Sequence, residues 1–215
     1  MQQSYMGIDI GGESGTWMCV LKPNGDTLTV VESPRVASLE EIVQYAEQYQ
    51  VAAVAIDAQL TWAISDKRGF RPSDLELRDI LPKQCINWVA SQNSLMAVPV
   101  RGRQLAEYLS PVVGTIIETH PRVCLYFADN SLLASVMLYK SNDGATHTEK
   151  LLRFWIKRFH IDAKTPMIKT HDALDSMVCA TVAYLYHHLP DQLKRLSYVA
   201  EDKRGRGPFV VIEPN

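Results

Sequence analysis

Five acidic residues stand where apolar residues would be expected, at strand positions or at a helix start. Asp9 lies inside the apolar stretch YMGIDIG, Asp57 ends VAAVAID, and Glu118 ends VVGTIIE. Asp172 and Asp175 lie three residues apart at the start of HDALDSMVCATVAYLYHHL, so they share one face of a helix. A buried, unpaired carboxylate is costly or changes its pKa, so a group of them predicts a neutralising cation.

Carboxylate oxygens are hard ligands, and they favour Mg²⁺ or Mn²⁺. Each acid alone also has a structural explanation: Asp57 could cap a loop, and Asp172 and Asp175 suit a first helical turn. Together they predict two metal ions about 4 Å apart, which can hold the attacking and leaving oxygens of a phosphodiester. The expected metal ligands are Asp9, Asp57, Glu118 and Asp175, and Asp172 completes the catalytic set.

The elements that would position these acids alternate between strands and helices. Strands are expected at 4–11, 16–22, 27–32, 51–57, 111–118 and 207–214. Asn24 and Gly25 indicate a hairpin, and Ser38 and Glu41 have the spacing of a capping box. Helices are expected at 38–49, 101–109, 121–139, 148–159 and 171–189. We therefore expect one α/β domain over 1–215, with a helical insertion around 61–110.

Composition limits the class of protein. The chain has 215 residues, of which 47% are hydrophobic and 21% charged, so we expect a packed core rather than disorder. The net charge of -2 argues against loose, charge-driven binding of nucleic acid but leaves room for a local basic groove. The four cysteines lack CxxC spacing, and neither a signal pattern nor an apolar run of membrane-spanning length is present. We expect a cytoplasmic protein that does not enter the membrane.

The order of elements resembles the ribonuclease H-like fold, in which a three-stranded antiparallel start is followed by a helix and further strands. HDALDSMVCA resembles the closing motif of RuvC-type resolvases. More closely, the chain is similar to the domain of unknown function 429 family, which is described as predicted nucleases. The matching motifs span most of the chain in order: GID at 7–9, AIDA at 55–58, RPSDLELR at 71–78, IETHPR at 117–122 and HDALDSMVCA at 171–180.

The resemblance implies a mixed sheet of at least five strands, three antiparallel and then parallel ones, with helices on both faces. It also implies metal-dependent hydrolysis of phosphodiester bonds, with DNA or RNA as the partner and a homodimer as the assembly. Arg71 and Arg78 would contact phosphate, and His120 and His171 would bind substrate near the metals. Exposed helix charges and structural histidines are the alternative interpretation of these four residues.

The sequence departs from the family pattern at Gln59, where proline is expected, and in the glycine-rich opening GIDIGGESG. Trp17 and Trp62 are candidates for stacking on a base, although a tryptophan in an apolar strand is commonly part of the core. Further candidates for the nucleic-acid backbone, or simply for solvated surface, are Lys67, Arg68, Arg101, Arg103, Lys203, Arg204 and Arg206.

Two other functions fit parts of the sequence. GIDIGGESGT resembles the first phosphate loop of sugar kinases and other actin-like ATPases. Those enzymes need two such domains, for which 215 residues are too few, and no second glycine-rich loop is present. A non-catalytic scaffold with this fold is the remaining alternative, since one fold hosts many functions.

Overall fold

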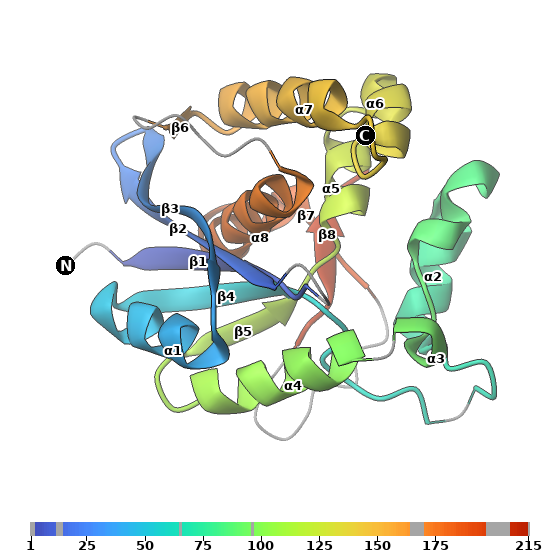
Figure 1. The fold of residues 1–215 in the computed structure, drawn as a ribbon, viewed down its shortest axis with the longest axis horizontal. Coiled ribbons are helices and arrows are strands. Elements are labelled where there is room, and N and C mark those ends of the chain that lie inside the picture. The colour runs from blue at the N-terminus through green and yellow to red at the C-terminus, as the bar shows by residue number, and fades with distance from the viewer. Residues whose placement is uncertain are drawn as a thin grey trace.

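A six-stranded mixed sheet runs through the centre of the protein, with strand order β5-β4-β1-β2-β3-β6 (Figure 1). The structure is a computed structural model that describes residues 3–11, 15–64, 66–95, 97–163, 170–196 and 207–214. The strands of the sheet are β1 (Ser4–Asp9), β2 (Thr16–Asn24), β3 (Thr27–Ala37), β4 (Val51–Asp57), β5 (Thr115–Glu118) and β6 (Ile161–Asp162). A separate pair is formed by β7 (Leu193–Arg195) and β8 (Val210–Ile212).

The direction of the strands brings three strand ends to one edge of the sheet. β1, β2 and β3 are antiparallel neighbours, whereas β4 and β5 both run parallel to β1. The carboxyl ends of β1, β4 and β5 therefore lie side by side. The expectation of a mixed sheet of at least five strands is confirmed.

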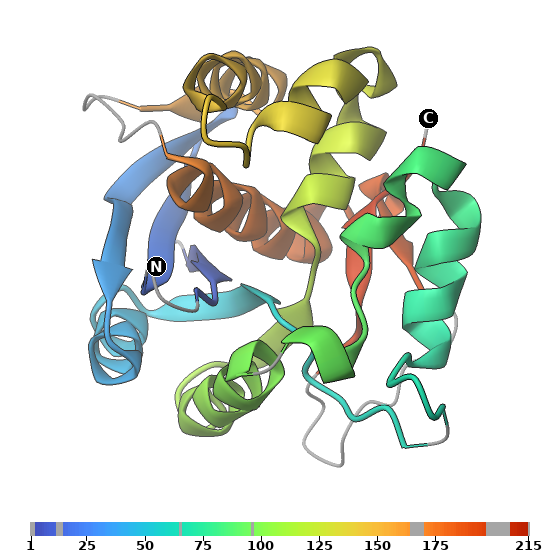
Figure 2. The ribbon, with the colours of Figure 1, turned by 45° about the vertical axis from the view of Figure 1, so that its right-hand side comes forward.

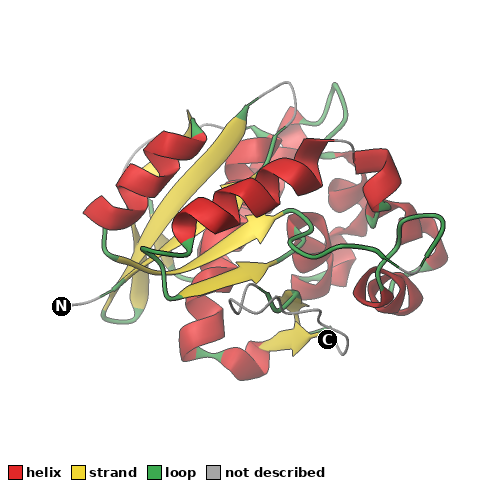
Figure 3. Ribbon diagram, turned by 90° about the horizontal axis from the view of Figure 1, so that it is seen from below, coloured by secondary structure: helices red, strands yellow, loops and turns green. Residues whose placement is uncertain are grey.

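Helices cover both faces of this sheet, as expected (Figures 1 and 3). One face carries α1 (Leu39–Gln48) and α4 (Ala97–Leu109), and the other carries α8 (His171–His188). Around α8 lie α5 (Pro121–Ala128), α6 (Leu133–Leu138) and α7 (Ala145–Arg158). The chain between β4 and α4 forms α2 (Pro72–Ile80), a 3-10 helix (Lys83–Trp88) and α3 (Gln92–Leu95), which lie to the side of the sheet (Figure 2).

Alternating side chains of the sheet supply two cores. In β1, Met6 and Ile8 face α1 and α4, while Tyr5 faces α8. Met6 and Ile8 are fully buried, and burial of a side chain of this size stabilises a fold by roughly 1.5–3 kcal/mol. The sheet is thus fixed from both sides, which holds its strand ends in place.

Gly7 sets the distance between β1 and α8. A Cβ atom at this position would overlap the backbone of Ser176 and Ala180, so only glycine permits the contact. The close approach brings the first turns of α8 to the end of β1. The Gly-Ile-Asp sequence therefore positions α8 as well as Asp9.

Several of the expected elements differ from the structure. The strand expected at 111–118 contains only β5, because α4 runs on to Leu109 and the chain then turns at Val113. The helix expected at 121–139 is broken at Asp129, whose carboxylate accepts a hydrogen bond from the Ser131 amide. The final strand is shortened to β8, which pairs with β7. Among the described helices, none combines the length and the apolar character that crossing a bilayer requires.

Candidate functional site

Three of the acids predicted from the sequence meet at the edge of the sheet where β1, β4 and β5 end. Asp9 pairs in register with Asp57, and Glu118 pairs with Ile56, the residue before Asp57. Asp9 is 7% exposed and Glu118 only 3%, so both carboxylates lie largely out of water. The strand order thus brings together acids that lie up to 109 residues apart in the sequence (118 − 9).

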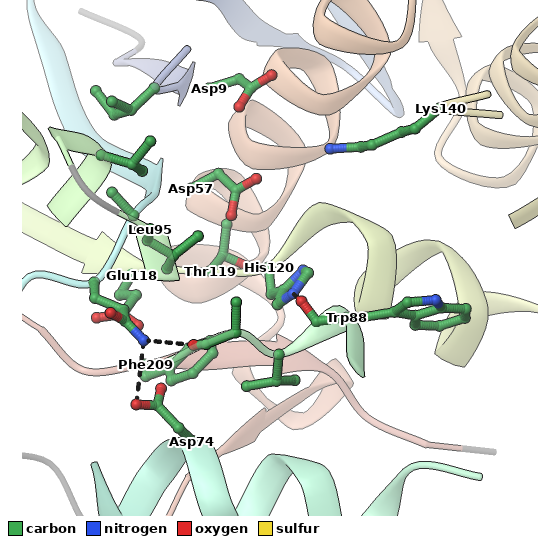
Figure 4. A pocket seen from close by; sticks show the side chains of 16 residues that line it. Asp9, Asp57, Asp74, Trp88, Leu95, Glu118, Thr119, His120, Lys140 and Phe209 are labelled. Carbon is green, nitrogen blue, oxygen red and sulfur yellow. Dashed lines mark hydrogen bonds between the residues drawn. The ribbon is translucent and has the colours of Figure 1, made fainter. Parts of the chain in front are cut away.

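A cavity of about 240 Å³ lies over these strand ends (Figure 4). Its polar lining includes Asp9, Asp57, Gln59, His120 and Lys140. Apolar side chains complete the wall, among them Val89, Leu95, Val98 and Phe209. In Figure 4 the Lys140 side chain reaches toward Asp9 and Asp57 from the opposite side of the cavity.

Helix α8 brings a further carboxylate, Asp175, to this edge. Thr170 caps the helix by accepting a hydrogen bond from the Ala173 amide. Asp175 is fully buried, and its Oδ2 lies 2.6 Å from Lys140 Nζ. The Tyr139 hydroxyl donates a hydrogen bond to Asp175 Oδ1 over 3.0 Å. We call Asp9, Asp57, Asp175 and Lys140 the Asp9 cluster.

Burial dominates the electrostatics of the Asp9 cluster. It raises the pKa of Asp57 to about 7 and the pKa of Asp9 well above its usual range; Lys140 opposes both shifts, and the negative charge of Asp175 adds to them. Burial alone would lower the pKa of Lys140, but Asp175 and the other nearby acidic groups raise it overall. Lys140 therefore stays charged while the two strand-end acids tend to take up protons.

Asp172 is a further carboxylate that acts on the Asp9 cluster. Its carboxylate lies 2.8 Å from His171 Nδ1. Burial raises its pKa, but His171, Lys140 and a hydrogen bond with Asp9 together outweigh this effect, so the pKa of Asp172 is lowered overall. Four carboxylates, those of Asp9, Asp57, Asp172 and Asp175, therefore interact with the single ammonium of Lys140.

Glu118, one of the predicted metal ligands, is bound by Arg71 in this structure. Its Oε2 accepts hydrogen bonds from Arg71 Nη1 at 2.7 Å and from the Leu60 amide at 2.9 Å, and Oε1 accepts from Arg71 Nη2. Both oxygens are thus occupied by protein donors. Asp74 binds the same guanidinium through both of its carboxylate oxygens. We call Arg71, Asp74 and Glu118 the Arg71 cluster.

Arg71 and Arg78, the predicted phosphate contacts, both bond to groups within the protein. All five N–H groups that a guanidinium offers are used by Arg71, on Asp74, Glu118 and Thr61. Arg78 donates to the carbonyls of Ile86 and Val89 and lies over the ring of Phe70. Both arginines therefore hold α2 to its surroundings.

The two predicted histidines lie near the acids. His120 lines the cavity, and its Nε2 lies 3.0 Å from the Trp88 carbonyl, which can only accept a hydrogen bond. Burial lowers the pKa of His120, so its ring is neutral, with the proton on Nε2 and a lone pair on Nδ1. His171 is partly exposed beside Asp172. The neutral His120 ring therefore offers no charge for binding phosphate.

The other predicted contacts to nucleic acid are mostly engaged within the protein. Arg101 donates to the Gly11 carbonyl and to Thr16, and Arg103 lies over the ring of Trp62. Trp17 lies within β2, directly opposite Asp9 in the pairing with β1. Lys67 and Arg68 are exposed, whereas Lys203, Arg204 and Arg206 lie outside the described residues.

The donor set suits a hard divalent cation in its chemistry. Asp9 and Asp57 are desolvated carboxylates with raised pKa values, and a cation would stabilise their charged forms. Within the described part of the chain, however, no three His, Cys, Asp or Glu side chains are grouped closely enough to hold a metal. Asp175 is turned to Lys140 and Glu118 to Arg71. Asp9 and Asp57 are therefore the residues that would bind the cation first.

Sequence reasoning missed Lys140, Tyr139 and Asp74 as partners of the acids. In the sequence, Asp74 stands out only as the middle residue of an RxxDxxxR pattern. No local pattern marks Lys140, which follows an apolar helix, as the counter-ion of a residue on α8. Charge is a general signal for such partners, because buried carboxylates require cationic partners elsewhere in the chain. No known protein-family model matches the chain, and no curated protein matches its sequence.

Proposed function

We propose that the protein is a divalent-metal-dependent nuclease that hydrolyses phosphodiester bonds of DNA or RNA. The observation that carries this proposal is the pairing of Asp9 with Asp57 at the ends of adjacent parallel strands, on the wall of a cavity. Both carboxylates have raised pKa values because of burial. A site that keeps desolvated acids next to a cavity is a candidate for chemistry rather than for stability.

The proposal includes a ribonuclease H-like fold of the type found in the domain of unknown function 429 family. The strand order β3-β2-β1-β4-β5, with an antiparallel start and parallel strands after it, supports this assignment. So does the position of the acids, which begin in the first strand and end on the late helix α8. The sixth strand, β6, has only two residues and extends the sheet beyond β3.

The roles of the side chains follow from their surroundings. A bound divalent cation would polarise a phosphodiester oxygen and lower the pKa of a water ligand. Asp9 and Asp57 would hold this cation, and they would release protons as it binds, because their pKa values are raised in its absence. Neutral His120 lines the same wall, and its buried Nδ1 has no hydrogen-bond partner among the described residues.

The test is cleavage of labelled single strands, duplexes, RNA–DNA hybrids and four-way junctions in Mg²⁺, Mn²⁺ or EDTA. We expect cleavage that requires the metal and that falls at least about a hundredfold in Asp9→Asn, since even outer partners of metal ligands cost up to that factor. Glu118→Gln is the matched control, because Glu118 is committed to Arg71. Metal-independent cleavage, or equal loss in both variants, would contradict the proposal.

One observation favours a second candidate, the non-catalytic scaffold. Lys140 already neutralises part of the acidic charge, as Arg71 does for Glu118 and Asp74. A scaffold would keep such pairs for stability alone and would bind neither Mn²⁺ nor nucleic acid. A calorimetric titration with Mn²⁺ separates the two candidates, because only the nuclease is expected to take up the ion.

A further inference from the structure

Lys140 is the one cationic side chain among the described residues that line the cavity. Its ammonium lies 2.6 Å from Asp175 Oδ2, and its charge also acts on Asp9 and Asp57. The side chain begins just after α6, in a turn, and approaches the strand ends across the cavity (Figure 4). It therefore stands among the carboxylates to which a divalent cation would have to bind.

The contact of Lys140 differs in kind from that of Arg71. The Arg71 side chain is 4% exposed, and each of its N–H groups donates a hydrogen bond, so its guanidinium is held in place. The Lys140 side chain is 34% exposed, and lysine carries a point charge on a flexible stem with four carbons. The ammonium can therefore move from Asp175 toward water without leaving a cavity in the core.

We propose that Lys140 is an internal counter-ion that competes with the divalent cation for the carboxylates of the Asp9 cluster. The inference rests on the proposed function, because it concerns the same cation. Without metal, the ammonium neutralises Asp175 and limits repulsion among the acids. When the cation binds, it takes over this neutralisation, and the Lys140 ammonium moves from Asp175 toward water.

Competition by Lys140 and a purely structural role of Lys140 predict opposite changes in metal affinity when the lysine is replaced. If Lys140 competes, its removal must tighten metal binding, since the cation no longer has to displace a charge. If Lys140 merely stabilises the local fold, its removal leaves binding unchanged or weakens it. Couplings between two binding events in one protein commonly amount to about 5–150-fold in affinity, so a change of this order is measurable.

The first experiment is a calorimetric titration with Mn²⁺ of the wild type, Lys140→Met and Lys157→Met. Lys157 is exposed on α7, so its replacement removes the same charge outside the cavity. We expect about tenfold tighter binding in Lys140→Met and no change in Lys157→Met. Equal or weaker binding in Lys140→Met would overturn the inference and leave the proposed function standing, whereas absence of binding from all three proteins would contradict both.

The second experiment needs no substitution and covers the case in which Lys140→Met does not fold. The wild type is treated with an amine-acetylating reagent with and without Mn²⁺, and the modification of each lysine is measured by mass spectrometry. We expect Mn²⁺ to increase acetylation of Lys140 severalfold, with Lys157 unchanged. Unchanged or reduced acetylation of Lys140, under conditions in which Mn²⁺ binds, would overturn the inference.

Discussion

The Arg71 cluster and the Asp9 cluster lie at the same edge of one sheet, but they differ in hydrogen bonding: in the Arg71 cluster every guanidinium N–H and every carboxylate oxygen has a protein partner. Arg71 binds both Asp74 and Glu118, each through two oxygens, and all three side chains are at most 4% exposed. In the Asp9 cluster, one ammonium faces several carboxylates beside a cavity. Both are buried ionic clusters, yet their hydrogen bonding assigns them different roles.

The difference shows how a structural acid can be told from a functional one. A buried ion pair is kept when every charge and every donor has a partner, because an incomplete network costs more than it stabilises. The Arg71 cluster meets this condition and ties α2 to the end of β5. The Asp9 cluster does not meet it with protein groups alone, which is why we assign to it the binding of a cation.

The largest effect is expected when Arg71 is replaced by methionine. Asp74 and Glu118 would then remain buried without their partner, and removing one member of a buried ion pair costs about 3–5 kcal/mol. The free energy of unfolding, measured with urea, would show this loss. A change below about 1 kcal/mol would mean that the Arg71 cluster is not the closed network we describe.

A companion variant makes the same comparison sharper. Replacing all three residues of the Arg71 cluster with apolar residues of similar size, as in Arg71→Met with Asp74→Leu and Glu118→Leu, removes the unpaired charges. We expect it to recover most of the stability that Arg71→Met loses, because apolar packing often replaces a buried ionic group without net cost. Continued instability of the triple variant would show that shape, rather than charge, governs this region.

A smaller effect of opposite sign is expected for Asp57→Asn. The pKa of Asp57 is raised to about 7 in the folded protein, above its value in the unfolded chain. The contribution of Asp57 to the free energy of unfolding is therefore fully present below the pKa of aspartate in the unfolded chain. It is lost as pH rises toward about 7, because over this range the unfolded state binds fewer protons than the folded state. Asp57→Asn should flatten this decline and, above neutrality, stabilise the metal-free protein by an amount of the order of 2 kcal/mol.

The measurement for Asp57→Asn is the free energy of unfolding as a function of pH, in EDTA. The Asp9 carboxyl, whose pKa is also raised by burial, should give a decline of the same sign that remains in the variant. The prediction would be contradicted if the free energy of unfolding of the wild type rose between the unfolded pKa of aspartate and neutrality and the variant showed the same slope. That result would mean that the charge of Asp57 is already neutralised in the folded protein.

The smallest effect concerns Arg78, which lies outside both clusters. Arg78→Met would remove two hydrogen bonds to the carbonyls of Ile86 and Val89, at a cost of about 1–2 kcal/mol. Mn²⁺ affinity should not change, since Arg78 contacts neither cluster in the described structure. Arg68→Met is the matched control: its side chain is 71% exposed, and its loss should alter stability by less than about 0.5 kcal/mol. Weaker Mn²⁺ binding in Arg78→Met would break the separation between the two regions.

The sequence predicted the acids better than their partners, for a physical reason. Asp9 and Asp57 end strands whose apolar runs and order along the chain are local signals, so their meeting at one edge could be expected. The partners of Glu118 and Asp175 depend on contacts 47 and 35 residues away along the chain, with Arg71 and Lys140, which no local pattern encodes. The same lack of a local signal explains the error at β5. VVGTII has the apolar pattern of a strand, but the turn that follows α4 occupies its first half.

Binding of Mn²⁺ to Asp57→Asn and Glu118→Gln, each titrated beside the wild type, tests the central claim most directly. Both variants remove one negative charge from neighbouring strand ends of the same sheet. We predict that Mn²⁺ binds the wild type with release of protons, binds Glu118→Gln with nearly the same affinity, and is lost or weakened at least about tenfold in Asp57→Asn. Equal binding by the two variants, or binding lost only in Glu118→Gln, would contradict the division into a closed structural cluster and an open cation site.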